Sequence, residues 1–356
     1  MRDGWTMLRG GAVLGVALLV GFAAIAEPAL RSPWDGSPVK MTDAPYACPA
    51  VPQIAPDLTT EGFYKLGDPT HSIVDPAREA AYQRSSGPVK AAGEKIVTAA
   101  DAYRTKGSRA AAECALKHVA AMAQEHSLTG TMSSNQAYYV QGWVAGAVAI
   151  AYLKIRDAHL ATPEEAKQIA DWLVAVGNES KGYFEPRRTE GKSDAHNNHL
   201  YWAGVELAAI GVVANNRADF NWAMGTYDAG VDQIRPDGTL PLEMARGQRA
   251  LHYHLYALAP LVMLAEFGEA NGLDLYARDH GAIHRLVNVS IAGLADPSLF
   301  VKATGVQQEV PKSVSGDQIG WAPPYVRRFP NAQLSKLIAN AKSLRVYYLG
   351  GLPPPE

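Results

Sequence analysis

The spacing of apolar residues after Pro76 constrains the fold of this chain more than any other feature. Apolar residues recur there at intervals of three and four, and alternating runs with β-branched residues are scarce, so the pattern predicts helices rather than strands. The expected helices include residues 108–126, 138–155, 164–176, 197–213, 218–234, 243–270, 280–294 and 332–341. About ten helices joined by short polar loops, without a linker rich in Pro, Gly or Ser, predict one all-α domain over residues 76–356.

Two further patterns narrow the arrangement of these helices. Residues 144–152 are apolar almost all round, which is typical of a helix buried on two sides. No clean internal repeat appears at the periods of helical repeat proteins, so the pattern favours an α/α bundle, barrel or toroid over a solenoid.

The N-terminal region is different in character. Arg2 and Arg9 precede an apolar run over residues 12–24 and a small-residue cleavage pattern at 24–26, so residues 1–26 are expected to be a secretory signal peptide. The alternative is an uncleaved membrane anchor, but the run is short for a span of about 20 residues. Residues 27–75 are rich in proline and are expected to form an extended arm and a lid loop. A periplasmic or secreted protein is therefore predicted, with no membrane association after signal cleavage.

Two cysteines, Cys48 and Cys114, remain after that cleavage. An exported protein can hold them as a disulfide between the arm and a helix, and the alternative is two unpaired thiols. Their spacing contains no zinc-binding pattern.

Charge and motifs exclude several classes of function. The chain has 33 Lys and Arg against 35 Asp and Glu, so it lacks the basic excess typical of nucleic-acid binding. It contains no Walker A motif, no usable G-x-G-x-x-G, no G-x-S-x-G and no H-E-x-x-H. A polyanionic substrate would therefore need a local basic groove.

One segment that carries chemistry spans residues 196–202. Asn198, His199 and Trp202 are spaced so that they share one face of a helix. The alternative is that an asparagine caps the helix and His199 is a core residue. A metal site would use His196 with His199, but no third ligand is nearby, so neither a metal nor another cofactor is expected.

A second segment spans residues 242–256. If it is one helix, Arg246, Arg249, Tyr253 and Tyr256 form a single stripe three turns long. The alternative is a buried network of arginines with Glu243 and packed tyrosines.

Arginine, asparagine, histidine and tyrosine together suit β-elimination from a 4-linked uronate. Arginine with asparagine or histidine neutralises the sugar carboxylate, which stabilises the charge that develops when the neighbouring proton leaves. A tyrosine or histidine removes that proton, and a tyrosine protonates the leaving oxygen. Tyr64, Tyr139 and Trp202 are candidates for stacking on sugar rings.

Both segments resemble polysaccharide lyase family 5, the alginate lyases. The family's Asn-Asn-His-x-Tyr-Trp is matched by residues 197–202, and its Leu-Pro-x-Glu-x-x-Arg-x-x-Arg-Ala-Leu-x-Tyr-His by residues 240–254. The resemblance implies an incomplete (α/α) toroid with a deep cleft that binds an anionic polysaccharide. It also implies that Asn198 and Arg246 neutralise the carboxylate, that His199 is a base or carboxylate partner, and that Tyr253 is the catalytic acid and, for mannuronate, also the base.

Substrate choice stays open at this point. Where mannuronate-cleaving members tend to carry Ser-Lys-Tyr, this chain has Phe63-Tyr64-Lys65, so poly-β-D-mannuronate and poly-β-D-glucuronate are both candidates. The residues expected to bind substrate are Tyr64, Lys65, Tyr139, Trp202, Arg249 and Tyr256.

Two other classes of function compete with a lyase. An (α/α)-barrel glycoside hydrolase would draw its two carboxylates from Glu206, Asp237 and Glu243. A non-catalytic protein of an exopolysaccharide secretion complex would use the same Arg and Tyr residues for binding alone.

Overall fold

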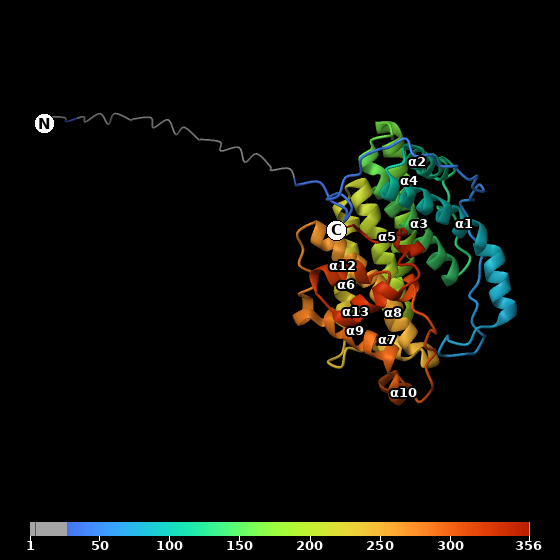
Figure 1. Cartoon of the computed structure of the whole chain (residues 1–356). Coiled ribbons are helices and arrows are strands. Elements are labelled where there is room, and N and C mark those ends of the chain that lie inside the picture. The colour runs from blue at the N-terminus through green and yellow to red at the C-terminus, as the bar shows by residue number, and fades with distance from the viewer. Residues whose placement is uncertain (1–3, 5–26, 356) are drawn as a thin grey trace.

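The computed structural model describes Gly4 and residues 27–355 and is almost entirely helical (Figure 1). The expected signal peptide, apart from Gly4, lies outside the described residues. No strand occurs in the described part, which has four isolated β-bridges. Its helices are α1 (Pro76–Lys106), α2 (Arg109–Gln124), α3 (Asn135–Ile155), α4 (Pro163–Thr189), α5 (Asn198–Ala214), α6 (Arg217–Val231), α7 (Pro241–Met244), α8 (Ala250–Ala270), α9 (Arg278–Ala295), α10 (Ser298–Thr304), α11 (Gly316–Ile319), α12 (Ala322–Arg328) and α13 (Ala332–Asn340). The predicted all-α class is confirmed.

The core is built around α3, α5 and α8. Each of these helices buries residues on every side. Helix α5, for example, packs against α3, α4, α6 and α8 at once. Small residues allow this close packing: a Cβ atom on Gly146 of α3 would lie 3.2 Å from the Cα of Glu206 in α5. The first turn of α5 and the beginning of α8 carry the two segments that sequence analysis singled out.

Two helices differ from expectation. Helix α4 runs on to Thr189 instead of ending near residue 176, and Pro186 lies in its last turn without ending it earlier. The single helix predicted over residues 243–270 is wrong. The chain forms α7, turns at Gly247 with a φ of 56°, and starts α8 at Ala250, since the left-handed backbone at Gly247 cannot continue a helix. Arg246 therefore lies in a turn and Arg249 ends a short 3-10 helix (Gly247–Arg249), so only Tyr253 and Tyr256 belong to α8.

The N-terminal arm crosses the helices and then reaches the site. Cys48 and Cys114 form a disulfide that ties the arm to α2. Further along, the Leu58 amide donates to the Thr131 carbonyl at 3.0 Å. Residues 64–74 then form a loop closed by the bridge between Tyr64 and Val74.

A buried ion pair fixes the C-terminal segment against the core. Lys154 of α3 donates to Asp101 at 2.7 Å and to the carbonyls of Gly350 and Leu352. Both charges are almost completely buried, so these contacts replace the water that the ammonium group loses on folding. The network holds in place the segment that carries Tyr348.

The helices of the described chain differ from membrane-spanning helices in length or apolar character. None of them alone combines the length and apolar character that crossing a bilayer requires, and α9 and α10, which meet at 99°, satisfy both only as a bent pair.

Candidate active site

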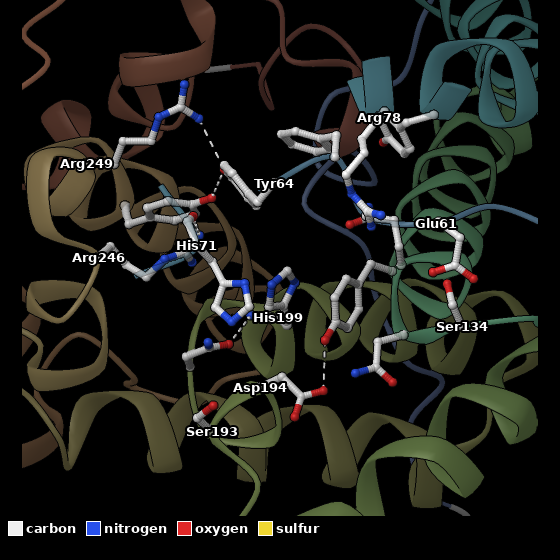
Figure 2. A pocket seen from close by; sticks show the side chains of 18 of the residues that line it. Glu61, Tyr64, His71, Arg78, Ser134, Ser193, Asp194, His199, Arg246 and Arg249 are labelled. Carbon is white, nitrogen blue, oxygen red and sulfur yellow. Dashed lines mark hydrogen bonds between the residues drawn. The ribbon is translucent and has the colours of Figure 1, made fainter. Parts of the chain in front are cut away.

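A deep cavity of about 1060 Å³ opens where α1, α3, α5 and the turn before α8 meet the loop of residues 64–74 (Figure 2). Its basic lining residues are Lys65, Arg78, Lys90, Arg187, Lys192, Arg246 and Arg249. Its acidic lining residues are Glu61 and Asp194. Seven basic side chains against two acidic ones make this cavity cationic in a chain whose net charge is −2. A local basic groove is therefore present.

Tyr253 lies at one wall of the cavity, within a chain of polar contacts. Its hydroxyl is hydrogen-bonded to the hydroxyl of Tyr64, which accepts a hydrogen bond from Nη1 of Arg249 at 3.1 Å. The guanidinium group of Arg246 lies 3.5 Å from the centre of the Tyr253 ring. Burial raises the pKa of Tyr253 well above its ordinary value, although Arg246 and Arg249 oppose that shift. Tyr253 is therefore a neutral phenol that can donate a proton.

The two arginines of the turn also hold neighbouring loops. Arg246 donates from Nε to the carbonyl of Thr70 at 2.8 Å and from Nη2 to that of His71 at 2.5 Å. Arg249 donates from Nε to Glu309 at 2.8 Å. Arg246 thereby joins the loop of residues 64–74 to the segment before α8. The loop and the cavity wall that carries Tyr253 are therefore connected directly.

His199 lies on the opposite side of the cavity floor, in the first turn of α5. Its ring stacks on Tyr139, with centroids 3.8 Å apart, and its Nδ1 is buried without a hydrogen-bond partner in the described residues. Burial, followed by the positive charge of Arg246, lowers the pKa of His199 to about 3. Figure 2 shows His71 next to His199. A neutral imidazole with a free nitrogen can accept a proton or a hydrogen bond from a substrate.

The asparagine pair before His199 is divided between two environments. Asn197 lines the cavity and caps α5, because its Oδ1 accepts from the His199 amide at 3.0 Å. Asn198 is fully buried, and its Nδ2 donates to both carboxylate oxygens of Glu243 at 2.9 and 3.0 Å. Burial raises the pKa of Glu243, against the hydrogen bonds from Asn198. Asn198 therefore lies behind the cavity wall, and Asn197 is the asparagine at its surface.

Trp202 also lies behind the wall. It packs against Tyr256, with ring centroids 5.1 Å apart, and against Tyr348 at 6.2 Å. Trp143 and Tyr348 reach the cavity in its place. Of the residues expected to act on or bind substrate, the cavity brings together Tyr64, Lys65, Tyr139, His199, Arg246, Arg249, Tyr253 and Tyr256.

Sequence reasoning missed Asp194 and His71. Asp194 accepts hydrogen bonds from Tyr139 at 2.8 Å, from Tyr183 at 2.6 Å and from two nitrogens of Arg187. Burial alone would raise the pKa of Asp194, but these hydrogen bonds lower it. Asp194 thus orients Tyr139, the ring on which His199 stacks. Neither residue lies in a motif, and only long-range packing brings them to the cavity.

The carboxylates considered for a glycoside hydrolase do not meet in the cavity. Glu206, Asp237 and Glu243 are all absent from its lining among the described residues. Glu206 is fully buried between helices and accepts from Ser180 at 2.7 Å. This arrangement does not provide the paired carboxylates that glycoside hydrolysis requires.

The described residues contain one compact set of potential metal ligands, and it lies away from the cavity. It consists of Cys48, Cys114 and His118, and both sulfur atoms are already in the disulfide. No equivalent set of His, Cys, Asp and Glu is found along the described cavity lining.

Comparison with known proteins identifies the family. Residues 61–300 match the family described as "Alginate lyase". The chain belongs to the alginate lyase family. A polysaccharide lyase of Stenotrophomonas maltophilia is 37% identical over 80% of this chain and 83% of its own length. An alginate lyase of Azotobacter vinelandii is 31% identical over 90% of this chain and 86% of its own. The predicted family is confirmed, and the alginate lyase assignment makes this protein a polysaccharide lyase.

Solved alginate lyases share the fold. The structure of alginate lyase A1-III from Sphingomonas species A1 matches with a TM-score of 0.72 and 23% identity over 90% of this chain and 89% of that one. A variant of A1-III complexed with a tetrasaccharide matches with a TM-score of 0.73, at 22% identity and with 90% and 88% coverage. These likenesses confirm the expected α/α toroid.

Proposed function

We propose that this lyase cleaves a 4-linked polyuronate, with poly-β-D-mannuronate as its first substrate, by β-elimination that needs no metal ion. The observation that carries the proposal is the convergence of Tyr253, Arg246 and His199 on one cationic cavity. Membership of the alginate lyase family supports it, as does the tetrasaccharide complex of the A1-III variant.

Neutralising the carboxylate is the first requirement of the reaction. Arg246 uses Nε and Nη2 on the loop carbonyls, which leaves Nη1 for the substrate. A neutral His199 still carries one ring N–H, and that N–H is a second donor for the carboxyl group. The amide of Asn198 is engaged by Glu243, so we assign it to fixing the first turn of α5. Donors placed in advance where charge develops stabilise the transition state most.

The proton transfers fall to Tyr253. In mannuronate the hydrogen on C5 and the oxygen on C4 lie on the same face of the ring, so one phenol can serve both steps. When substrate binds, Tyr253 first gives up its phenolic proton to solvent. The phenolate oxygen then takes the C5 proton, the C–H electrons form the C4–C5 double bond, and the C4–O bond breaks. The departing oxygen then receives the proton from Tyr253. Arg246 beside the ring and the hydrogen bond from Tyr64 stabilise the phenolate that this role requires.

Poly-β-D-glucuronate is the second candidate substrate. Its sugar differs from mannuronate at C2 only, so Tyr253 would reach C5 and O4 in the same way. The observation that favours it is the aromatic wall formed by Tyr139, Trp143 and Tyr348, which the flat face of an all-equatorial ring fits. The contacts made to the C2 hydroxyl would decide between the two polymers.

The activity is tested by the ultraviolet absorbance of the unsaturated product. Mannuronan, alginate and glucuronan are each incubated with the wild type and with Tyr253→Phe. We expect the absorbance to rise with the wild type. With Tyr253→Phe the rate of that rise should be about 10³-fold lower, because an acid–base group contributes about 10²–10⁴-fold to the rate. No rise on any polymer would overturn the proposal.

We also propose that the protein works in the periplasm or outside the cell. The disulfide between Cys48 and Cys114 supports this, because disulfides persist in oxidising compartments. Mass spectrometry of the protein recovered from a periplasmic extract tests it, and the expected mature chain begins at Glu27. A full-length chain retained in the cytoplasm would contradict it.

A further inference from the structure

Arg78 differs from the other guanidinium groups of the cavity in having no partner. Arg187 is paired with Asp194, Arg249 with Glu309, and Arg246 with two backbone carbonyls. Within the described chain Arg78 forms no ion pair and no side-chain hydrogen bond, although it lines the cavity.

The Nε atom of Arg78 is buried without a hydrogen-bond acceptor. A buried donor that has lost water and gained no partner is costly, and donors of charged groups are the costliest. The two Nη groups of Arg78 are not buried in this way, so they are the donors that an acceptor entering the cavity can reach. A carboxylate matches the geometry of a guanidinium group, which can bind both of its oxygens at once.

The surroundings of Arg78 leave room for that acceptor. The Asp75 carboxylate is occupied in capping α1, where it accepts from the amides of Ala77 and Arg78. Glu61 lines the same side of the cavity but is exposed and forms no ion pair with Arg78 among the described contacts. Asp75 is therefore engaged in capping the helix, and Glu61 is exposed to solvent.

The place of Arg78 in the cavity separates it from the reacting centre. Arg78 belongs to the first turn of α1, and Figure 2 shows it across the cavity from Arg246 and Arg249. Tyr82, one turn further along α1, also lines the cavity, and the ammonium group of Lys90 lies 4.2 Å from the centre of its ring.

We propose that Arg78 forms a second carboxylate-binding subsite, which holds a uronate residue of the polymer other than the one being cleaved. The inference rests on the proposed function, since each sugar of a polyuronate carries one carboxylate. A chain lying along the cavity past Tyr253 therefore brings a further carboxylate to α1. This subsite would favour long chains over short ones and would act on binding rather than on the chemical step.

The test compares Arg78→Gln with Arg84→Gln. Arg84 lies on the same helix, is exposed and does not line the cavity, so the second variant makes the same change of charge without touching the subsite. With long mannuronan we expect Arg78→Gln to raise KM about tenfold, the value of a charge-assisted hydrogen bond that is partly open to solvent, and to change kcat less than about twofold. Arg84→Gln should leave both constants unchanged, and Arg78→Lys should recover part of the loss.

Salt and chain length sharpen the result. The rise of KM with added NaCl should be shallower for Arg78→Gln, because one ionic contact is missing. The shortest cleavable oligomer, which does not reach α1, should show no difference between the variants. Equal KM values for Arg78→Gln and Arg84→Gln, or a loss confined to kcat, would overturn the subsite.

Failure of the subsite can be told apart from failure of the proposed function. Equilibrium binding of the same mannuronan and of glucuronan is measured by titration calorimetry on the wild type, Arg78→Gln and Arg84→Gln. If the wild type binds but forms no unsaturated product, the lyase assignment to these polymers fails, and the ratio of the two variants' affinities still tests Arg78. Equal affinities in the two variants would refute the subsite alone.

Discussion

Tyr64 links Arg249 to Tyr253, and removing its hydroxyl tests whether that link supports the proton transfer. In Tyr64→Phe, the phenol of Tyr253 loses its hydrogen-bond partner and Nη1 of Arg249 loses an acceptor at 3.1 Å. The ring of Tyr64 remains packed on Phe63, with centroids 4.5 Å apart, so the loop should keep its shape.

The size of the effect follows from the type of contact. A hydrogen bond to a charged group contributes about 1.5–3 kcal/mol, and this one gains its full strength only when Tyr253 carries negative charge. We therefore expect kcat to fall about 10- to 100-fold, with KM changed much less. Tyr253→Phe, which removes the reacting group itself, should lose more.

The assay is initial-rate kinetics on mannuronan, followed by product absorbance, with Tyr103→Phe as control. Tyr103 is fully buried and donates to Asp157 at 2.9 Å, far from the cavity lining, so its variant reports any general loss of stability. A Tyr64→Phe enzyme with wild-type kcat would refute the link. A loss confined to KM would also refute it, because it would place Tyr64 in substrate binding alone.

Three further predictions concern stability. Burial raises the pKa of Glu206 from an ordinary value of 4.5 to about 8, so the folded protein holds this proton when the unfolded chain has lost it. As the pH rises from 4.5 to about 8, the free energy of unfolding should therefore fall by about 1.4 kcal/mol per pH unit. Glu206→Gln should remove that dependence in urea titrations at several pH values. The double variant Cys48→Ser/Cys114→Ser should lose about 2–4 kcal/mol, as should the wild type in reductant. Lys154→Met leaves the buried Asp101 with Arg345 as its one cationic partner among the described residues, and it leaves the carbonyls of Gly350 and Leu352 without their donor. It should cost about 3 kcal/mol by denaturant unfolding, whereas an unchanged midpoint would contradict the role of Lys154.

Apolar spacing was sufficient to predict the helices of the core, because apolar residues at helical intervals mark the faces of a helix that become buried. Helix α3 is apolar around its whole circumference, and the structure buries it on every side. The second half of α4 could not be predicted in the same way. Residues 177–189 are largely polar and include Pro186, so tertiary packing accounts for their helical form. Gly177 lies close to Leu207 and Ile210 of α5, and Tyr183 stacks on Tyr138 of α3.

The break before α8 shows the limit of periodicity. The spacing of Arg246, Arg249, Tyr253 and Tyr256 is compatible with a helix, yet the left-handed backbone at Gly247 interrupts it. The four side chains still reach one cavity. They do so because the turn points both arginines toward the loop, where Thr70 and His71 accept from Arg246.

The motifs supplied most of the reacting groups but not their surroundings. His199 and Tyr253 are candidates by residue type alone, because histidine and tyrosine are among the few side chains that transfer protons in catalysis. It does not indicate that Asn198 lies behind the wall, since that depends on Glu243, 45 residues away. Arg78 and Asp194 could not be predicted either, because their place in the cavity depends on how α1 and the short helix of residues 193–195 pack.

The central claim is that the cavity breaks the polymer by elimination, and the fate of water tests it most directly. Mannuronan and glucuronan are digested in water enriched in heavy oxygen, and the oligosaccharides are weighed by mass spectrometry. Elimination predicts that the fragment with the new non-reducing end carries a C4–C5 double bond and is lighter by one water than the same fragment formed by hydrolysis. Solvent oxygen at the anomeric carbon is not counted, because that oxygen exchanges with water at any reducing end. Saturated fragments that all have the mass of hydrolysis products would contradict the account.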